Sequence, residues 1–331
     1  MQQHFNGEEF ENWIKTANNY GRDSVPFVFM IDYDFNKPYI KKVDEIETSE
    51  LLYNFNGFTN CIKTNNDLKD SVEIKAYPME FSKYEAAYNY VQYNEYLGNS
   101  YLINLTFPFK VELNASLKEI FYRSFAKYKI WYQDKFVCFS PEIFIKIEDG
   151  IISSYPMKGT IDASIENARE LIMANEKEAA EHATIVDLIR NDLSMVSNNV
   201  SVERYRYIDK IISKQRNLLQ VSSKIIGKLD TNYKDRIGEI IATLLPAGSI
   251  TGAPKKKTVE IIKQAENYER GYYCGICGHY DGHNLDSGVM IRFIENINGE
   301  YYYKTGGGIT IYSNVGSEYE ELKNKIYVPI S

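Results

Sequence analysis

The chain is organised around the stretch Tyr155-Pro156-Met157-Lys158-Gly159-Thr160. A strand-like run, residues 150–154, precedes it, and a polar, helix-prone run begins at Asp162. Proline fixes its own φ and favours extended backbone at the preceding residue, while glycine permits a positive φ. The stretch therefore predicts a strand-to-helix turn with Lys158 at its apex. A lysine that is held and desolvated there can lose its proton and act as a nucleophile, whereas a solvated turn lysine has no such role.

Size and composition exclude several classes of protein. The 331 residues suffice for one large domain or two small ones. A net charge of -7 argues against a non-specific nucleic-acid binder, which would be basic. No apolar run approaches the ~18 residues of a membrane span, and the first residues do not resemble a signal peptide. Four cysteines in a chain of this length form no disulfide framework, so a reducing cytoplasmic location is expected.

Upstream of Lys158 the pattern predicts strands with a few helices. Residues 1 to about 80 look β-rich and irregular, with a buried strand expected at 25–31 and an alternating one at 72–76. A long helix is expected over residues 81–97, ended by Gly98. The other elements expected here are a helix at 117–125 and strands at 101–111, 129–131, 135–139 and 143–147.

Downstream of Lys158, Asn175 and Glu178 have the spacing of a capping pair, and they open a helix expected to run to about residue 189. Helices are also expected at 233–245, 254–264 and 317–326, and strands at 272–280, 287–295, 300–304 and 309–312. No internal repeat or low-complexity linker divides the chain. We therefore expect a single α+β domain over residues 1–331, with antiparallel strands and helices packed outside them.

Two pairs of carboxylates are spaced to share a helix face. Glu178 and Glu181 form one i, i+3 pair, and Glu318 and Glu321 form the other. Carboxylate oxygens of this kind suit Mg²⁺, a hard cation that keeps several of its waters. Two solvated helix faces are the alternative that the spacing leaves open.

Three further motifs are consistent with ligand binding. The run Gly306-Gly307-Gly308 can offer backbone N–H groups to an anion, or it can be a plain turn. Arg292 follows an apolar run, so a buried guanidinium there needs an anionic partner, either an internal carboxylate or a substrate. Cys274 and Cys277 lie near two histidines, but their spacing is too cramped for a usual zinc site.

Taken together, these segments resemble the chorismate-utilising enzymes, a family that includes the large components of anthranilate and aminodeoxychorismate synthases and the isochorismate and salicylate synthases. The resemblance covers about residues 81–331, and residues 1–80 look like a shortened, weakly matching N-terminal part. It implies two antiparallel β-sheets packed together and flanked by helices. The matching blocks are SPE at 140–142, PMKGT at 156–160, EHATIVDLIRNDL at 181–193, PAGSITGAPK at 246–255, YCGICG at 273–278, IRF at 291–293, GGG at 306–308 and EYEEL at 318–322.

The resemblance also implies catalytic roles. Aminodeoxychorismate synthases look like Pro-Ile-Lys-Gly-Thr where anthranilate synthases look like Pro-Ile-Ala-Gly-Thr, and this chain has Lys158. Lys158 would add to the chorismate ring, and ammonia would then displace the covalent intermediate. Glu142 would be the general acid that protonates the leaving hydroxyl, because hydroxide leaves poorly unless it is protonated.

The binding residues follow from the same resemblance. Glu181 and Glu321 would bind Mg²⁺, with Glu178 and Glu318 beside them, and the metal would hold the ring carboxylate. The remaining substrate-binding residues implied are Tyr273, Arg292 and the N–H groups of Gly307 and Gly308 at the enolpyruvyl carboxylate, together with Gly159, Thr160, Ser249 and Thr251.

Two positions depart from the pattern of related enzymes. Leu102 stands where isochorismate and salicylate synthases carry a lysine base and ammonia-using members usually carry glutamine. Gln220 stands where anthranilate synthases have a histidine, and glutamine cannot relay a proton. The resemblance therefore favours formation of 4-amino-4-deoxychorismate from chorismate and ammonia, for p-aminobenzoate and folate synthesis, with a separate glutamine amidotransferase subunit as the ammonia source. An anthranilate synthase component I, or a non-catalytic chorismate or tryptophan sensor, are the alternatives.

Overall fold

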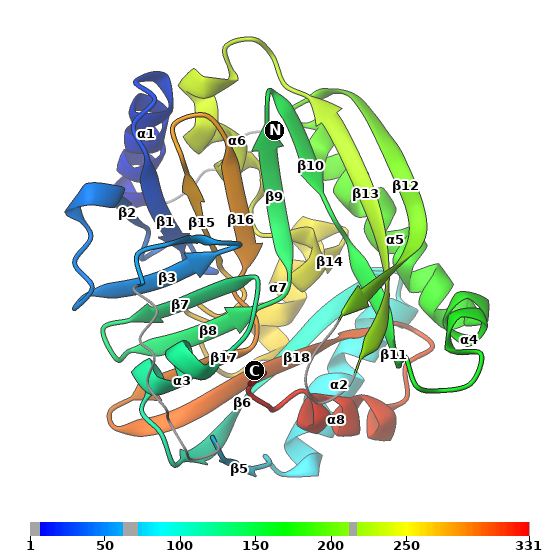
Figure 1. The fold of residues 1–331 in the computed structure, drawn as a ribbon. Helices are drawn as coiled ribbons and strands as arrows, with labels where there is room; N and C mark the ends of the chain where they lie inside the picture. The colour runs from blue at the N-terminus through cyan, green and yellow to red at the C-terminus, as the bar shows by residue number, and fades with distance from the viewer. Residues whose placement is uncertain (1–6, 62–71, 212–216, 331) are drawn as a thin grey trace.

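The computed structural model describes residues 7–61, 72–211 and 217–330. Within these residues two antiparallel β-sheets of nine strands each form the body of the molecule, and helices cover their outer surfaces (Figure 1). One hydrophobic core joins the two sheets, with Phe29 and Ile147 from the first and Tyr53 and Ile130 from the second. The fold expected from the sequence, two antiparallel sheets flanked by helices, is confirmed.

The first sheet contains the strand that carries Lys158. Its strands follow the order β11-β13-β10-β9-β16-β15-β1-β2, and β12 also pairs with β13. Lys158 therefore lies beside β13 near one end of the sheet, where β12 is the outermost strand. The bounds are β11 (Met157–Asp162), β13 (Leu218–Lys228), β10 (Ile151–Ser154), β9 (Ile143–Glu148), β16 (Leu285–Val289), β15 (Ile276–Tyr280), β1 (Phe27–Ile31), β2 (Tyr39–Lys42) and β12 (Asn198–Ile211).

The second sheet contains the glycine run. Its order is β14-β6-β18-β17-β8-β7-β3-β4, and β5 also pairs with β6. The N-terminal part contributes to both sheets, since β1 and β2 lie in the first and β3 and β4 in the second. The bounds are β14 (Gly252–Ala253), β6 (Leu102–Leu113), β18 (Glu300–Ile309), β17 (Phe293–Ile297), β8 (Phe136–Ser140), β7 (Tyr128–Tyr132), β3 (Leu51–Phe55), β4 (Phe58–Thr59) and β5 (Ile74–Tyr77).

Two of the points at which the chain crosses between the sheets are neighbours. The chain passes from β8 to β9 through Glu142 and returns from β16 to β17 through Arg292. Backbone hydrogen bonds link the two crossings, because Val289 N donates to Glu142 O at 3.1 Å and Phe139 N donates to Arg292 O at 3.0 Å. Two predicted site residues are thus fixed side by side where the sheets meet.

Helices cover the sheets according to their apolar faces. α5 packs on β11, β12 and β13, while α2 packs on α7, α8 and β18. α1 buries Phe10, Trp13 and Ala17 and packs on α6. The helices are α1 (Glu8–Arg22), α2 (Phe81–Tyr96), α3 (Leu117–Arg123), α4 (Ala168–Ala174), α5 (Glu176–Ser194), α6 (Ile237–Leu244), α7 (Lys255–Ala265) and α8 (Val315–Asn324), with short 3-10 turns η1 (Val43–Glu45), η2 (Tyr233–Arg236) and η3 (Gly248–Ile250). None of the helices described is long and apolar enough to cross a membrane.

The structure corrects the prediction for the lysine stretch. Lys158 lies within strand β11 and not at the apex of a strand-to-helix turn, and the next helix begins only at Ala168. Gly159 has φ +76°, and the pairing register of β11 with β13 shifts between Lys158 and Thr160. The positive φ that the glycine permits is therefore used in a β-bulge, which changes the direction of the strand without ending it.

Four other predictions were wrong. The N-terminal part is not only β-rich, because α1 precedes β1, and the long β12–β13 pair was not predicted. The strand predicted at 287–295 is two strands, β16 and β17, separated by the crossing that carries Arg292. The run Gly306-Gly307-Gly308 does not follow a strand but lies within β18. The separate strand predicted at 309–312 is not formed, because β18 ends at Ile309 and a turn follows. The predicted helices at 81–97 and 117–125 and the strands at 129–131, 135–139 and 143–147 are confirmed within a few residues.

Candidate active site

Lys158 reaches from the first sheet towards the second. Its Nζ lies 3.7 Å from Glu181 Oε2 on α5. A Cβ placed on Gly308 of β18 would lie only 3.2 Å from the same Nζ, so the ammonium group packs against the glycine backbone. Lys158, Glu181 and Gly308, which come from three separate elements, therefore meet at one place.

Glu142 is held at the first crossing by the loop that follows α6. Ser249 Oγ donates a hydrogen bond to Glu142 Oε1. Burial raises the pKa of the Glu142 carboxyl, and the Ser249 hydrogen bond and the positive charge of Lys158 offset part of that rise. A carboxyl group with a raised pKa keeps its proton to higher pH, which is what a general acid requires.

The loop that carries Ser249 is fixed from inside. Thr251 is fully buried, and its Oγ1 donates to Ala247 O at 2.9 Å. Arg270 Nη1 donates to Ile250 O at 2.9 Å. Thr251 is thus part of the loop's internal hydrogen bonding, and Ser249 is the loop residue that contacts Glu142.

The two glutamate pairs face each other across a lysine. Asn175 Oδ1 caps α5 by accepting from Glu178 N at 3.1 Å, as the sequence predicted. Lys177 Nζ lies 3.8 Å from Glu181 Oε1 and 3.4 Å from Glu318 Oε1, so one ammonium group contacts both helices. The structure therefore brings α5 and α8 together through residues of the two predicted pairs.

Charge compensation differs between the two helices. Burial raises the pKa of Glu181, and the negative charges of Glu178 and Glu318 add to the rise, while Lys158 and Lys177 oppose it. On α8, desolvation acts to raise the pKa of Glu321, but Lys325, whose Nζ is 2.7 Å from Glu321 Oε1, outweighs it together with Lys158 and Lys177 and leaves that pKa lowered.

These carboxylates provide the hard oxygen atoms that Mg²⁺ prefers. Among the described residues no three His, Cys, Asp or Glu side chains are already grouped as metal ligands, because Lys158 and Lys177 lie between the carboxylates. The carboxylate oxygens of the glutamates suit a divalent cation. The cation would compete with Lys158 and Lys177 for these carboxylates.

The glycine run presents one open edge. β18 pairs with β6 along Gly306, Gly307 and Gly308, whereas its pairing with β17 ends at Lys304. Gly306 O accepts from Lys325 Nζ at 2.8 Å on the open edge. Because backbone groups alternate along a strand, Gly308 N–H shares that edge and Gly307 N–H is directed towards β6. The geometry thus favours Gly308 over Gly307 as a donor to a substrate anion.

Arg292 lies at the second crossing with φ +55°. Its guanidinium carbon lies 5.3 Å from the ring centre of Tyr327, and its Nε is buried without a hydrogen-bond partner in the described part of the chain. Tyr273, which is 3% exposed, packs against Phe293 immediately after Arg292. An anion at this position would accept a hydrogen bond from the unpaired Nε. The anionic partner of Arg292 therefore stays a prediction, and the unpaired Nε is consistent with it.

The two departures from related enzymes lie near Lys158. Leu102 Cδ1 would be 3.1 Å from a Cβ on Gly308, so Leu102 borders the same glycine as Lys158 and offers no group that can take a proton. Gln220 lies on β13, opposite Thr160 of β11.

The two predicted substrate-binding residues after Lys158 have different surroundings. Thr160 is exposed. Gly159 lies next to Glu178, whose Oε2 would be 3.5 Å from a Cβ placed on Gly159.

A family model described as chorismate binding enzyme matches residues 41–331. The chain belongs to this family. It is 48% identical over 320 residues to an uncharacterised PabA-like protein of Haemophilus influenzae, with 97% of both chains covered. It is 34% identical over 197 residues to aminodeoxychorismate synthase component 1 of Bacillus subtilis, covering 58% of this chain and 41% of that protein. The menaquinone-specific isochorismate synthase of Escherichia coli has the same fold, with a TM-score of 0.71 at 14% identity, covering 95% of this chain and 80% of that one.

Three residues of this chorismate-binding enzyme's site were missed from the sequence. Lys325 is four residues after Glu321, a helical spacing that could have indicated the ion pair. Lys177 is likewise four residues before Glu181 on a helix, whereas Glu95 gave no comparable signal. Glu95 ends up 5% exposed in the last turn of α2, where burial, helped by the negative charges of Glu181 and Glu318, raises its pKa to about 8.

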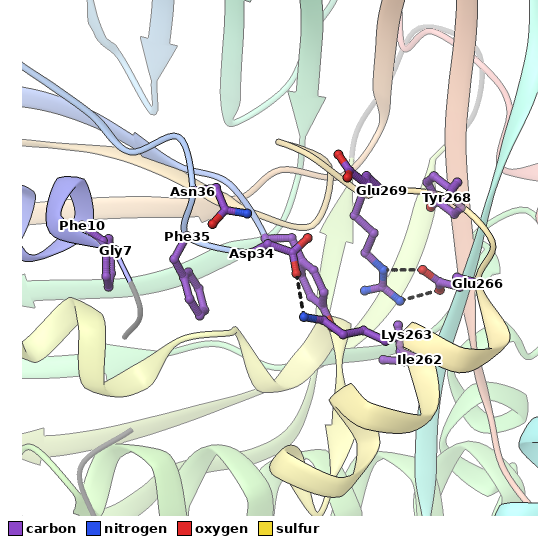
Figure 2. Close-up of a pocket in the computed structure, with 12 residues that line it drawn as sticks. Gly7, Phe10, Asp34, Phe35, Asn36, Ile262, Lys263, Glu266, Tyr268 and Glu269 are labelled. Carbon is purple, nitrogen blue, oxygen red and sulfur yellow. Dashed lines mark hydrogen bonds and ion pairs between the residues drawn. The ribbon is translucent and has the colours of Figure 1, made fainter. Parts of the chain in front are cut away.

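The chorismate-binding enzyme also has a cavity of about 540 Å³ away from Lys158, between α1, the loop at 32–36 and α7 (Figure 2). Its wall includes Glu266, labelled in Figure 2, and the buried Arg270 that pairs with it. Arg270 Nη2 lies 2.6 Å from Glu266 Oε1 and also donates to Asn104 O at 2.7 Å. Since Arg270 also holds Ile250 O, this pair connects the cavity wall to β6 and to the Ser249 loop.

Proposed function

We propose that this chain is an aminodeoxychorismate synthase component I, which converts chorismate and ammonia to 4-amino-4-deoxychorismate. The observation that carries the proposal is the convergence of Lys158 with Glu181 and Gly308 in a chorismate-binding enzyme. The similarity to the aminodeoxychorismate synthase of Bacillus subtilis, over 58% of the chain, supports the same choice.

In the proposed reaction Lys158 forms the first new bond. Neutral Lys158 Nζ attacks the ring of chorismate, and the ring hydroxyl leaves as water with the proton of Glu142. Ammonia then adds to the ring while the bond to Lys158 breaks. Lys158 leaves as the neutral amine and the new ring ammonium returns a proton to Glu142, so both residues are regenerated and one water and one 4-amino-4-deoxychorismate are formed.

The other residues bind and orient the substrate. Arg292 and Gly308 N–H would take the enolpyruvyl carboxylate, and Tyr273 would support Arg292. Glu181 and Glu321 would hold Mg²⁺, with Glu178 and Glu318 beside them, and the metal would supply positive charge at the ring carboxylate.

Anthranilate synthesis is the second candidate, and two residues argue against it. Gln220 cannot relay a proton as the histidine of those enzymes does, and Lys158 replaces their alanine. Leu102 cannot activate water, which also disfavours hydroxylation of the ring. A non-catalytic sensor of chorismate or tryptophan would not need Lys158 and Glu142, so retention of both favours an enzyme. Ammonia would come from a separate glutamine amidotransferase subunit or from solution.

The test is to incubate the protein with chorismate, Mg²⁺ and ammonium and to convert the product with aminodeoxychorismate lyase to p-aminobenzoate. We expect p-aminobenzoate from the wild type, and loss of most of it in Lys158→Ala and in Lys158→Arg, because guanidinium stays charged. Lys224→Ala, which removes a lysine of β13 paired with Glu203, is the matched control.

Mass spectrometry distinguishes the mechanism from the product assignment. Wild-type protein given chorismate without ammonia should carry an adduct at Lys158, whereas Lys158→Ala should bind chorismate without forming it. Wild-type rates in Lys158→Ala would refute the nucleophile assignment. Anthranilate as the product would instead refute the aminodeoxychorismate assignment.

A further inference from the structure

A buried ion pair beside the Ser249 loop has no role in the proposed reaction. Lys255 is the first residue of α7, and its Nζ lies 2.8 Å from Oδ2 of Asp192 in the last turn of α5. The two side chains are only 12% and 13% exposed. Burial raises the pKa of Asp192, although the charge and hydrogen bond of Lys255 oppose that rise. Burying two charges costs desolvation energy, so stability alone is a weak explanation for such a pair.

Lys255 ties together the two ends of the loop that carries Ser249. Its Nζ also donates to the backbone oxygen of Leu244, the last residue of α6, at 3.0 Å. An ammonium group has three N–H donors, and two of them are used in this way. Residues 245–254 lie between Leu244 and Lys255, so one ammonium group closes the loop and attaches it to α5.

The loop also packs directly on α5. A Cβ placed on Gly248 would lie 2.9 Å from Leu188 Cδ2 and 3.1 Å from Asp192 Oδ2. The backbone of Gly248 is therefore in close contact with the helix, and a side chain there would push the loop away from it. Since Gly248 directly precedes Ser249, the contact fixes how far Ser249 lies from α5.

Ser249 transmits this position to Glu142. Its Oγ donates a hydrogen bond to Glu142 Oε1. Glu142, Ser249, Gly248 and Asp192 also line one small cavity of about 30 Å³. A cavity of this volume has room for roughly one water molecule, so the ion pair and the acid are near neighbours.

We propose that Asp192 and Lys255 are positioning residues for the general acid, because their ion pair holds the loop against α5 and so keeps the hydrogen bond from Ser249 to Glu142. This inference rests on the role of Glu142 in the proposed function. α5 also carries Glu181, the partner of Lys158, about three turns before Asp192. One helix thus sets the surroundings of both the nucleophile and the acid.

The charges around Glu142 decide what loss of this position does to its proton. Burial raises the pKa of Glu142. The Ser249 hydrogen bond opposes this rise, as do three cations from other elements, Lys158, Arg292 and Lys325. Loss of the Ser249 hydrogen bond should therefore raise the pKa further. Because the acid acts in its protonated form, the fall of kcat on the high-pH side should move to higher pH.

The test measures kcat against pH in Lys255→Met and Asp192→Asn, which change the local charge in opposite directions. A direct electrostatic effect on Glu142 would raise its pKa in Lys255→Met and lower it in Asp192→Asn. If the pair acts by positioning, both variants move the high-pH fall of kcat to higher pH. Shifts in opposite directions would overturn the proposal.

The size of the effect gives a second readout. We expect kcat of Lys255→Met to fall by up to about 100-fold, with KM for chorismate near that of the wild type, because Glu142 acts in the transition state. Lys257→Met is the matched control. It makes the same substitution on the same helix, in an exposed pair with Glu260, and should keep the wild-type profile. An unchanged kcat and pH profile in Lys255→Met would also overturn the proposal.

Ser249→Ala separates positioning from a merely structural role. It removes the hydrogen bond directly, so it should reproduce the pH shift, and adding Lys255→Met to it should lower kcat little further. If the double variant instead loses the product of the two single effects, Lys255 acts by another route and the proposal fails.

The outcomes also separate this inference from the proposed function. If Lys255→Met does not fold, the direction of the pH shift in Asp192→Asn decides the question alone. A wild type that turns over no chorismate refutes the role of Glu142 and this inference with it. In an active wild type, whatever its product, the contrary results above refute only the positioning role of the pair.

Discussion

The buried pair of Glu266 and Arg270 offers a quantitative test of how the Ser249 loop is held. Both side chains are 2% exposed. The substitution Arg270→Met leaves Glu266 buried with only neutral donors, chiefly Thr106 N at 2.7 Å and Thr106 Oγ1 at 2.9 Å. Breaking a buried ion pair by removing one partner costs about 3–5 kcal/mol. We expect Arg270→Met to lose stability of that size.

The expected shift in melting temperature follows from chain length. An unfolding entropy of about 2.1 cal/mol/K per residue gives roughly 0.7 kcal/mol/K for this chain, so 3–5 kcal/mol corresponds to about 4–7 °C. The loss of the hydrogen bond to Ile250 O should also misplace Ser249 and Glu142. We expect kcat to fall by up to about 100-fold at a temperature where the variant is folded.

Urea unfolding, monitored by tryptophan fluorescence, measures the free energy of unfolding of each variant. Adding Glu266→Gln to Arg270→Met removes the uncompensated charge, so the double variant should recover at least about 1 kcal/mol. The exposed pair of Arg236 and Glu239 is the control, and Arg236→Met should cost less than about 1 kcal/mol. A loss below about 1 kcal/mol in Arg270→Met, or a double variant no more stable than the single one, would refute the reasoning.

Three further predictions concern metal, ammonia and pH. Glu181→Gln and Glu321→Gln should each lose most of the activity while staying folded, and full wild-type activity in EDTA would contradict the metal assignment. Ammonium alone should support turnover, and glutamine only with an added amidotransferase subunit; glutamine-dependent turnover by the isolated chain would contradict this. His279 stacks on Phe58 at 4.0 Å, and its burial lowers its pKa to about 4. The unfolded chain therefore binds the extra proton as pH falls from about 6.5 to about 4, which removes up to about 3 kcal/mol of stability; His279→Phe should lose less between pH 7 and pH 5 in urea titrations, and an identical loss would contradict the assignment.

The sequence predicted elements best where local signals decide them. The capping pair Asn175 and Glu178 indicated the start of α5, and the proline and glycine around Lys158 indicated a special backbone there. However, Pro156 and Gly159 are compatible with a turn and also with a bulged strand. Pairing with β13 decided between them, and β13 itself was not predicted. The helix α1 did carry a signal, since Phe10, Trp13 and Ala17 have helical spacing.

Long-range packing explains what remained unpredictable. Nothing local marks Met290 to Arg292 as a crossing between sheets, because the interruption is imposed by the two sheets that the chain joins. The burial of Glu95 likewise depends on α8, more than 200 residues further along the chain. Backbone chemistry indicated Lys158 and helical spacing indicated the four glutamates as candidates, and resemblance to a family then implied their roles and added Glu142. The contacts between helices and strands at these residues, such as Lys158 with Glu181 and Lys177 with Glu318, came only from the fold.

The position of β18 has a consequence for how the protein is made. This strand fills the centre of the second sheet, where Tyr301 pairs with Val111 and Ile309 with Ile103. At about 5–20 residues per second a ribosome adds β18 roughly 10–40 s after β6. Throughout that interval β6 has one unpaired edge and an apolar face containing Leu105, Phe107 and Phe109. An unpaired apolar strand can pair with other chains, so we expect the nascent protein to be prone to aggregation until β18 has emerged.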